Sequence, residues 1–282
     1  MATDLGADGW LLISAALVLF MTPGLAFFYG GMDRSRNVLN MLMVNFWCLL
    51  TIPVLWAVIG YSIAGANGAD FDKKFIGSLD FAFLKGLGIS GETGGTDLIV
   101  LTFLGMFAGI TPALISGAVA DRMKFSAWAI FAPVWMLLVF APVFKWVYGG
   151  WLGSRGSLDF AGGTAIHVNA GIAALAVILV LGKRKGWPRE GHPPHNMPNA
   201  GSALGANATA IQAFVNTFLA AAAAGLAWAI VEKLRDGHFT NLGAASGIVA
   251  GLVAITPGAG FVSGMSPIYI GIIAGTLCCF AV

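Results

Sequence analysis

Long apolar runs recur along the chain, and they constrain its fold more than any other feature. An α-helix needs about 20 apolar residues to cross the roughly 30 Å hydrocarbon layer of a membrane. We count eight such runs in the 282 residues, near 10–32, 39–64, 97–120, 125–148, 161–182, 208–231, 242–257 continuing to 262, and 267–282. A spanning β-barrel would need shorter segments that alternate in polarity. The sequence therefore predicts an all-α, polytopic bundle of about eight membrane helices.

Charged residues are scarce, and their scarcity excludes several classes of protein. They make up 10% of the chain, against about 25% in soluble domains, so a cytosolic globular protein is excluded. The formal charge of +2 provides no basic stripe, and we expect no nucleic-acid partner. Cys48, Cys278 and Cys279 lie in apolar runs without metal-site spacing, so we expect no metal, no cofactor and no disulfide framework.

The loops between the predicted spans divide the positive charges unevenly. One set of loops holds Arg34, Arg36, Arg122, Lys124, Lys183, Arg184, Lys185, Arg189, Lys233 and Arg235, and the other holds Lys73, Lys74, Lys85, Lys145 and Arg155. Positive loops stay in the cytoplasm, which predicts a multi-pass protein of the cell membrane with its N-terminus outside. The first ten residues contain Asp4 and Asp8 but no Lys or Arg. A signal peptide begins with positive residues, so we expect the first span to be retained.

The same rule exposes an inconsistency in the second half of the chain. The basic loops 183–196 and 232–241 should both be cytoplasmic, so an even number of spans should separate them. Two crossings and a turn need roughly 40 residues, but only 197–231 lies between the loops. Either one span is absent, or the small, polar stretch 199–207 enters and leaves the membrane within the protein.

Ionisable residues inside a membrane span are costly and point to function. His167 lies inside the fifth run, and Asp159 lies at its outer end. Positions one helical turn from His167 hold Gly163, Gly171 and Ala174, small residues that let another helix approach. We predict that the imidazole projects into a space between helices. The alternative is a structural histidine bonded to a neighbouring carbonyl.

Three residues of the third run share one face of the predicted helix. Phe103 and Phe107 are four residues apart, and Thr111 follows one turn later. An aromatic pair that faces a pore could bind a cation through its π faces and exclude water. Phe140 and Phe144 have the same spacing, so the pair could equally belong to the lipid surface or the core.

A short motif occurs twice in the apolar runs. The tripeptide Ile-Thr-Pro is found at 110–112 and at 255–257, and a Ser-Gly pair follows each copy. Proline leaves the carbonyl one turn earlier without its amide donor. Interrupted helices at corresponding positions of two halves are typical of transporters built from an internal repeat. A chance match of three residues is the alternative.

Several longer strings of the sequence are distinctive. They are PGLAFFYGG at 23–31, SGAVADR at 116–122, DFAGGTAIH at 159–167, PHN at 194–196, NAGS at 199–202 and FVNT at 214–217. Together they resemble the ammonium transporters, the family that includes the methylammonium permeases and the Rhesus proteins. The resemblance covers nearly the whole chain, and DFAGGT followed by histidine is its most specific element.

The resemblance implies a fold of eleven helices, with two inverted five-helix halves and a homotrimer that has one pore per subunit. It also implies roles for single residues. Phe107 is expected to be the outer residue of a phenylalanine gate, and Phe103 part of the aromatic mouth. Ser202 is expected to accept a hydrogen bond from ammonium. Asp159 matches a carboxylate near that outer site, and His167 the first of two pore histidines.

The chain departs from the family pattern at several positions. Tyr148 occupies the place of a tryptophan at the outer site, and Pro198 that of the second gate phenylalanine. The span expected before residue 199 is missing, and the chain ends at Val282, before the last two expected helices. We therefore expect one transporter domain, 1–282, that lacks the sixth, tenth and eleventh helices. Residues 1–182 would form the first five helices, and 183–282 an incomplete second half.

The function implied is transport of ammonium, ammonia or methylammonium through an apolar pore lined by His167, Phe107, Thr111 and Thr256. Phe103, Phe107, Tyr148, Ser202 and Asp159 would form the outer substrate site. The lipid bilayer, a homotrimer and a cytoplasmic regulatory protein are the implied partners. One alternative is a truncated, non-conducting member of the family. A membrane enzyme is disfavoured, because the membrane spans contain no metal cluster and no nucleophile with a base.

Overall fold

The computed structural model describes residues 5–65, 75–88, 95–184 and 208–282. Within these ranges every regular element is helical, which confirms the all-α prediction. The chain divides into two compact units. The first unit contains Met1–Ser157 and Thr164–Gly201, and the second contains Leu158–Gly163 and Ser202–Val282. The single transporter domain with an inverted repeat stays a prediction.

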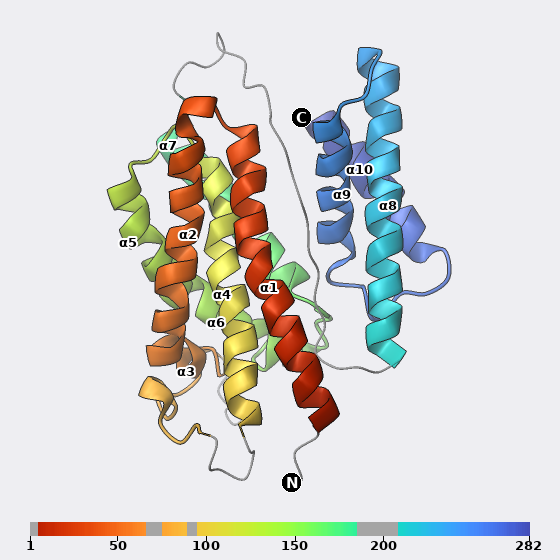
Figure 1. Ribbon diagram of the computed structural model, residues 1–282. Coiled ribbons are helices and arrows are strands. Elements are labelled where there is room, and N and C mark those ends of the chain that lie inside the picture. Colours follow the sequence, from red (N-terminus) through yellow and green to blue (C-terminus); the bar gives the residue numbers. More distant parts are fainter. Residues whose placement is uncertain (1–4, 66–74, 89–94, 185–207) are drawn as a thin grey trace. The chain divides into compact units, whose positions relative to one another are not determined.

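The first unit is a helical bundle with α4 at its centre (Figure 1). Helix α4 lies against α1, α2 and α7, and most of its second half is buried. The helices of this unit are α1 (Leu5–Met32), α2 (Val38–Leu55), α3 (Tyr61–Ile63), α4 (Thr96–Val119), α5 (Phe125–Trp135), α6 (Ala141–Tyr148) and α7 (Asn169–Leu181).

Three wider, π-helical segments join some of these helices. Segment η2 (Trp56–Gly60) connects α2 to α3, η4 (Met136–Phe140) connects α5 to α6, and η6 (Gly163–Val168) leads into α7. Pro53 precedes η2 and Pro133 precedes η4 by three residues each. A π-helical turn inserts one extra residue, and such turns are frequent at functional sites. Short 3₁₀ turns complete the unit at Ser35–Asn37, Ala82–Leu84 and Gly153–Arg155.

The second unit has three helices that pack along one another (Figure 1). They are α8 (Ala208–Asp236), α9 (Asn241–Ile255) and α10 (Ser266–Ala281). Helix α8 contacts both of the others, and glycines of α9 and α10 lie directly on its backbone. Small residues allow this close approach between membrane helices.

The predicted spans correspond closely to the observed helices. Among the described residues, six helical stretches are long and apolar enough to cross a membrane: Gly6–Met32, Ser35–Ile63, Thr96–Val119, Phe125–Arg155, Gly163–Leu181 and Ile211–Asp236. Two further apolar helices, α9 and α10, have 15 and 16 residues, which is shorter than a full crossing. The chain is therefore that of a multi-pass membrane protein.

The seventh predicted span is shorter than expected. Helix α9 ends at Ile255 and does not continue to Val262. Pro257 has no amide hydrogen to extend the helical ladder. The chain instead turns, with the Gly258 N–H bonded to the Ile255 carbonyl and the Val262 N–H to the Gly258 carbonyl.

Residues 197–231, which are too few for the two crossings that the charge distribution requires, are helical wherever the structure describes them. Helix α8 is one continuous helix of 29 residues, long enough for a single crossing. Residues 197–207 lie outside the described residues. The orientation of 232–282 stays a prediction.

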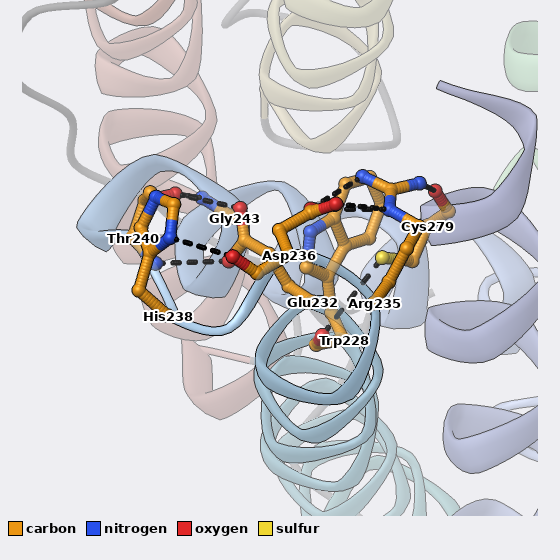
Figure 2. Close-up of polar contacts among 8 residues, drawn as sticks. All are labelled: Trp228, Glu232, Arg235, Asp236, His238, Thr240, Gly243 and Cys279. Atoms are coloured by element: carbon orange, nitrogen blue, oxygen red, sulfur yellow. Dashed lines mark hydrogen bonds and ion pairs between the residues drawn. The ribbon is translucent and has the colours of Figure 1, made fainter.

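Side chains at the end of α8 organise the turn into α9 (Figure 2). The Glu232 carboxylate accepts hydrogen bonds from the Thr240 N–H and hydroxyl, both at 2.9 Å. The Thr240 hydroxyl oxygen in turn accepts the Gly243 N–H at 2.9 Å and caps α9. Arg235 donates to the Cys279 carbonyl at the end of α10. These bonds satisfy backbone groups that the helix ends leave without partners.

Replacing Thr240 by alanine should therefore destabilise the α8–α9 turn. The change removes a capping acceptor, which costs about 0.5–2 kcal/mol, and we expect a lower thermal unfolding midpoint in detergent. Thr240→Ser keeps the hydroxyl and should unfold close to the unmodified protein. Equal midpoints for all three proteins would show that the cap contributes nothing.

Candidate functional site

The predicted aromatic pair of the third span is buried in the core of the first unit. Phe103 is 2% exposed and Phe107 8% exposed, which excludes the lipid-facing alternative. Their ring centroids lie 5.1 Å apart in an edge-to-face arrangement. An aromatic pair prefers this geometry. The two rings therefore form one rigid aromatic stripe along α4.

Thr111 lies on the same helix but uses its hydroxyl locally. Its side chain is fully buried and donates to the Phe107 carbonyl at 2.6 Å. Thr256 likewise donates to the Leu252 carbonyl, one turn earlier in α9. Neither hydroxyl bonds to the carbonyl that loses its helical donor to the following proline, on Ala108 or Val253. The Val253 carbonyl instead accepts the Thr256 N–H at 3.3 Å. The two hydroxyl oxygens can still accept a hydrogen bond, but the hydroxyl hydrogens are already donated to the Phe107 and Leu252 carbonyls.

The two Ile-Thr-Pro copies lie in different surroundings. Pro112 lies inside the continuous helix α4, whereas Pro257 lies just beyond the end of α9. The shared tripeptide therefore does not interrupt both helices in the same way.

Tyr148 is the last residue of α6 and is 36% exposed. Its ring centroid lies 4.7 Å from that of Phe144, one turn earlier. Phe144 and Phe140 are buried. The helix thus carries a row of rings that ends at an accessible tyrosine, as an outer aromatic site would require.

Asp159 begins the helix that carries His167. One carboxylate oxygen accepts the N–H groups of Gly162 and Gly163, at 2.8 and 2.7 Å. A carboxylate at a helix N-terminus satisfies free donors and interacts favourably with the helix dipole. The side chain is 8% exposed. Asp159 therefore acts directly on the backbone at the start of this helix.

The loop around Asp159 packs on the turn that follows α9. The Phe160 N–H donates to the Pro257 carbonyl at 3.2 Å, and the Phe160 and Phe261 rings meet edge to face at 5.7 Å. A Cβ on Gly163 would lie 2.4 Å from the Pro257 ring, so only glycine fits there. This contact connects two segments almost 100 residues apart in the sequence.

His167 lies in the π-helical segment η6 and is partly buried. Gly163, four residues earlier, is the first residue of η6 and packs against Pro257, so this small residue does let another segment approach. The small-residue face of His167 stays a prediction. Helix α7, which continues from η6, lies along α4. The fold thus places the segments of His167 and the phenylalanine pair on neighbouring helices.

Lys145 was assigned to an outer loop, and this assignment is wrong. The residue lies within α6 and is 1% exposed. Its Nζ atom lies 2.8 Å from the position that a Cβ on Gly65 would occupy. The sequence did not predict this burial, because a lysine near the end of an apolar span is normally assigned to the membrane interface.

Positive residues of the predicted cytoplasmic loops bind the ends of the first unit's helices. Arg34 pairs with Asp121 at 3.3 Å. Arg122 donates to the Gly182 and Ala118 carbonyls at 2.8 and 2.7 Å. Burial, and then the charge of Arg184, lower the pKa of Arg122. Arg122 thus satisfies carbonyls at the C-terminal ends of α4 and α7, whereas Arg34 binds a side chain that follows α4.

Two parts of the predicted site remain to be placed. Ser202 and Pro198 lie outside the described residues. A search of the described ranges finds no cluster of three His, Cys, Asp or Glu that could hold a metal ion.

Comparisons with known proteins place this arrangement in a family. The model of the Ammonium Transporter Family matches residues 9–282. The ammonium transporter of Mycobacterium tuberculosis (strain H37Rv) is 46% identical over 322 residues, covering 99% of this chain and 67% of the relative. That of Aquifex aeolicus is 47% identical over 300 residues, covering 99% of this chain and 69% of the relative.

A solved structure supports the same fold. Saccharomyces cerevisiae Mep2 superposes with a TM-score of 0.87 and 34% identity, covering 99% of this chain and 68% of Mep2. The chain thus spans about two thirds of the length of these relatives. Both sequence matches run over more positions than the 282 residues of this chain. The relatives therefore contain internal residues that have no counterpart here.

Proposed function

Since the chain belongs to the ammonium transporter family, we propose that it moves ammonium or ammonia, and methylammonium as an analogue, across a cell membrane. The family match over residues 9–282 carries this proposal. We assign the outer substrate site to the buried phenylalanine pair and the accessible Tyr148. We assign the pore to the helix that carries His167. The chain acts as a transporter and not as an enzyme, as its relatives' names indicate for them.

The outer site recognises the ion by its hydrogens. Ammonium and potassium are similar in size, but ammonium carries four N–H donors that need acceptors or π faces. Phe103, Phe107 and Tyr148 supply the π faces, and Ser202 supplies an oxygen acceptor. Asp159 holds the nearby backbone in place through Gly162 and Gly163.

The pore beyond the gate favours the neutral molecule. A full charge is costly among buried apolar side chains, so ammonium loses its proton before passage. His167 then offers a hydrogen-bond partner to ammonia or a route for the proton. Thr111 and Thr256 contribute oxygen acceptors, because their hydrogens are already committed to carbonyls.

The orientation and assembly follow the family pattern. We place the N-terminus outside, since Arg34, Arg122 and Arg184 lie on the side that the charge rule assigns to the cytoplasm. A homotrimer with one pore per subunit and a cytoplasmic regulatory protein complete the proposal.

Uptake of methylammonium into proteoliposomes tests the function. The unmodified chain should accumulate the substrate, and Phe107→Ala should raise KM about 5- to 30-fold, because a desolvated cation–π contact is worth about 1–2 kcal/mol. Phe20→Ala is the matched control, since Phe20 is 68% exposed on α1. It should leave KM unchanged.

Absence of uptake by the unmodified chain would contradict the proposal. That result would favour a non-conducting member of the family. The internal residues that the relatives have and this chain lacks make this the second candidate. An equal KM for Phe107→Ala and Phe20→Ala would instead remove Phe107 from the substrate site.

A further inference from the structure

Trp56 lies at the junction of two π-helical turns in the first unit. It is the first residue of η2 and is fully buried. Its ring centroid lies 6.1 Å from that of Phe140, the last residue of η4. A Cβ on Gly60 would lie 3.4 Å from the Met136 sulfur, so the two turns pack closely together. Both turns follow a proline of an otherwise regular helix.

The indole of Trp56 is bound to the helix of the phenylalanine pair. Its Nε1–H donates to the Leu101 carbonyl of α4 at 3.1 Å. A Cβ on Gly105 would lie 2.9 Å from Trp56 Cδ1, so the indole fills the space that a side chain at 105 would need. Gly105 lies between Phe103 and Phe107 in the sequence. The position of Trp56 therefore determines how closely this part of α4 approaches α2.

The same indole contacts the row of rings on α6. The Trp56 and Phe144 centroids lie 6.1 Å apart, edge to face. Phe144 in turn contacts Tyr148 at 4.7 Å. Trp56 is thus in contact with both helices that carry the aromatic residues of the outer site, while it is itself inaccessible to substrate.

We propose that Trp56 is a positioning residue that sets the separation of the α4 rings from the α6 rings and thereby the size of cation the protein accepts. This inference rests on the proposed transport function. Protein interiors are close-packed, so a smaller ring at a contact point shifts its neighbours or leaves a void. Either result should widen the aromatic site and favour the larger methylammonium over ammonium.

The test compares Trp56→Phe with the unmodified full chain in proteoliposomes. The readout is the ratio of kcat/KM for methylammonium to that for ammonium, because the amount of folded protein cancels in this ratio. We expect the ratio to rise about fivefold or more. Trp128→Phe is the matched control, since Trp128 is also fully buried and donates its indole N–H to a helix carbonyl, that of Val44, at 2.9 Å. The control should leave the ratio unchanged.

A second variant displaces the indole without removing it. Gly105→Ala pushes against Trp56 Cδ1 and should also shift the ratio. Unchanged ratios in both variants, with uptake intact, would overturn the positioning role and leave the transport function standing. An equal shift of the ratio in Trp128→Phe, or loss of folding in both variants, would show that Trp56 contributes only to general packing. No uptake by the unmodified chain would overturn both proposals.

Discussion

Replacing Asp159 by alanine is expected to reduce methylammonium uptake at least about 100-fold. The change leaves the N–H groups of Gly162 and Gly163 without the acceptor that binds both of them. Each buried, unsatisfied donor costs about 1–3 kcal/mol, and the helix that carries His167 begins at the second of these glycines, Gly163. The start of the helix should therefore shift, and His167 with it.

Two control variants separate this effect from a loss of charge. Asp159→Asn keeps one acceptor oxygen and should retain partial uptake, whereas Asp80→Ala removes a carboxylate at an exposed position and should change nothing. His167→Ala should also lower uptake if the histidine lines the pore. Unmodified uptake by both Asp159→Ala and His167→Ala would refute the assignment of the site.

Adding one methyl group at Gly275 should destabilise the second unit. An alanine Cβ at this position of α10 would lie 2.2 Å from the Ala224 carbonyl oxygen of α8. The contact is with backbone, which cannot rotate away, so the two helices must separate. Overpacking of this kind costs about 1–3 kcal/mol. We expect less folded protein and a clearly lower unfolding midpoint in detergent.

Gly109→Ala provides the matched control for this prediction. Gly109 is also a glycine inside an apolar helix, but the nearest atom to its added Cβ, the Cys48 carbonyl oxygen, is 3.9 Å away. An alanine there should be tolerated and could even stabilise the helix, because alanine has the higher helix propensity. Equal midpoints for the two variants would mean that α8 and α10 separate without cost.

The sequence predicted the helices well because the signal is local. Each apolar run of sufficient length must be helical in a membrane, whatever its neighbours are. The exceptions have specific causes. Helix α9 ends early at Ile255 because Pro257 cannot donate a hydrogen bond. The π-helical turn at Gly163–Val168 has no signal in the hydropathy pattern.

The roles of the candidate site residues stay predictions, and the structure adds how those residues are arranged. Phe103 and Phe107 were placed on one helical face by their spacing, and the structure adds their burial and their edge-to-face contact. Asp159 was expected near the outer site, and the structure adds its bonds to two backbone amides. The sequence did not predict the burial of Lys145 or the contacts of Trp56, because a buried lysine and a central tryptophan have no distinctive pattern in an apolar run.

Hydropathy and short motifs are sufficient to identify this chain as a helical membrane protein, to locate most of its helices and to show which family it resembles. Those properties depend on hydropathy and on short strings, which act within a single helix or loop. The contacts of Trp56 with Leu101 and Phe144 and the bond from the Phe160 N–H to the Pro257 carbonyl are visible only in the folded chain. Such contacts join residues far apart in the chain. Their geometry depends on how closely whole helices pack, and no local sequence pattern reports that distance.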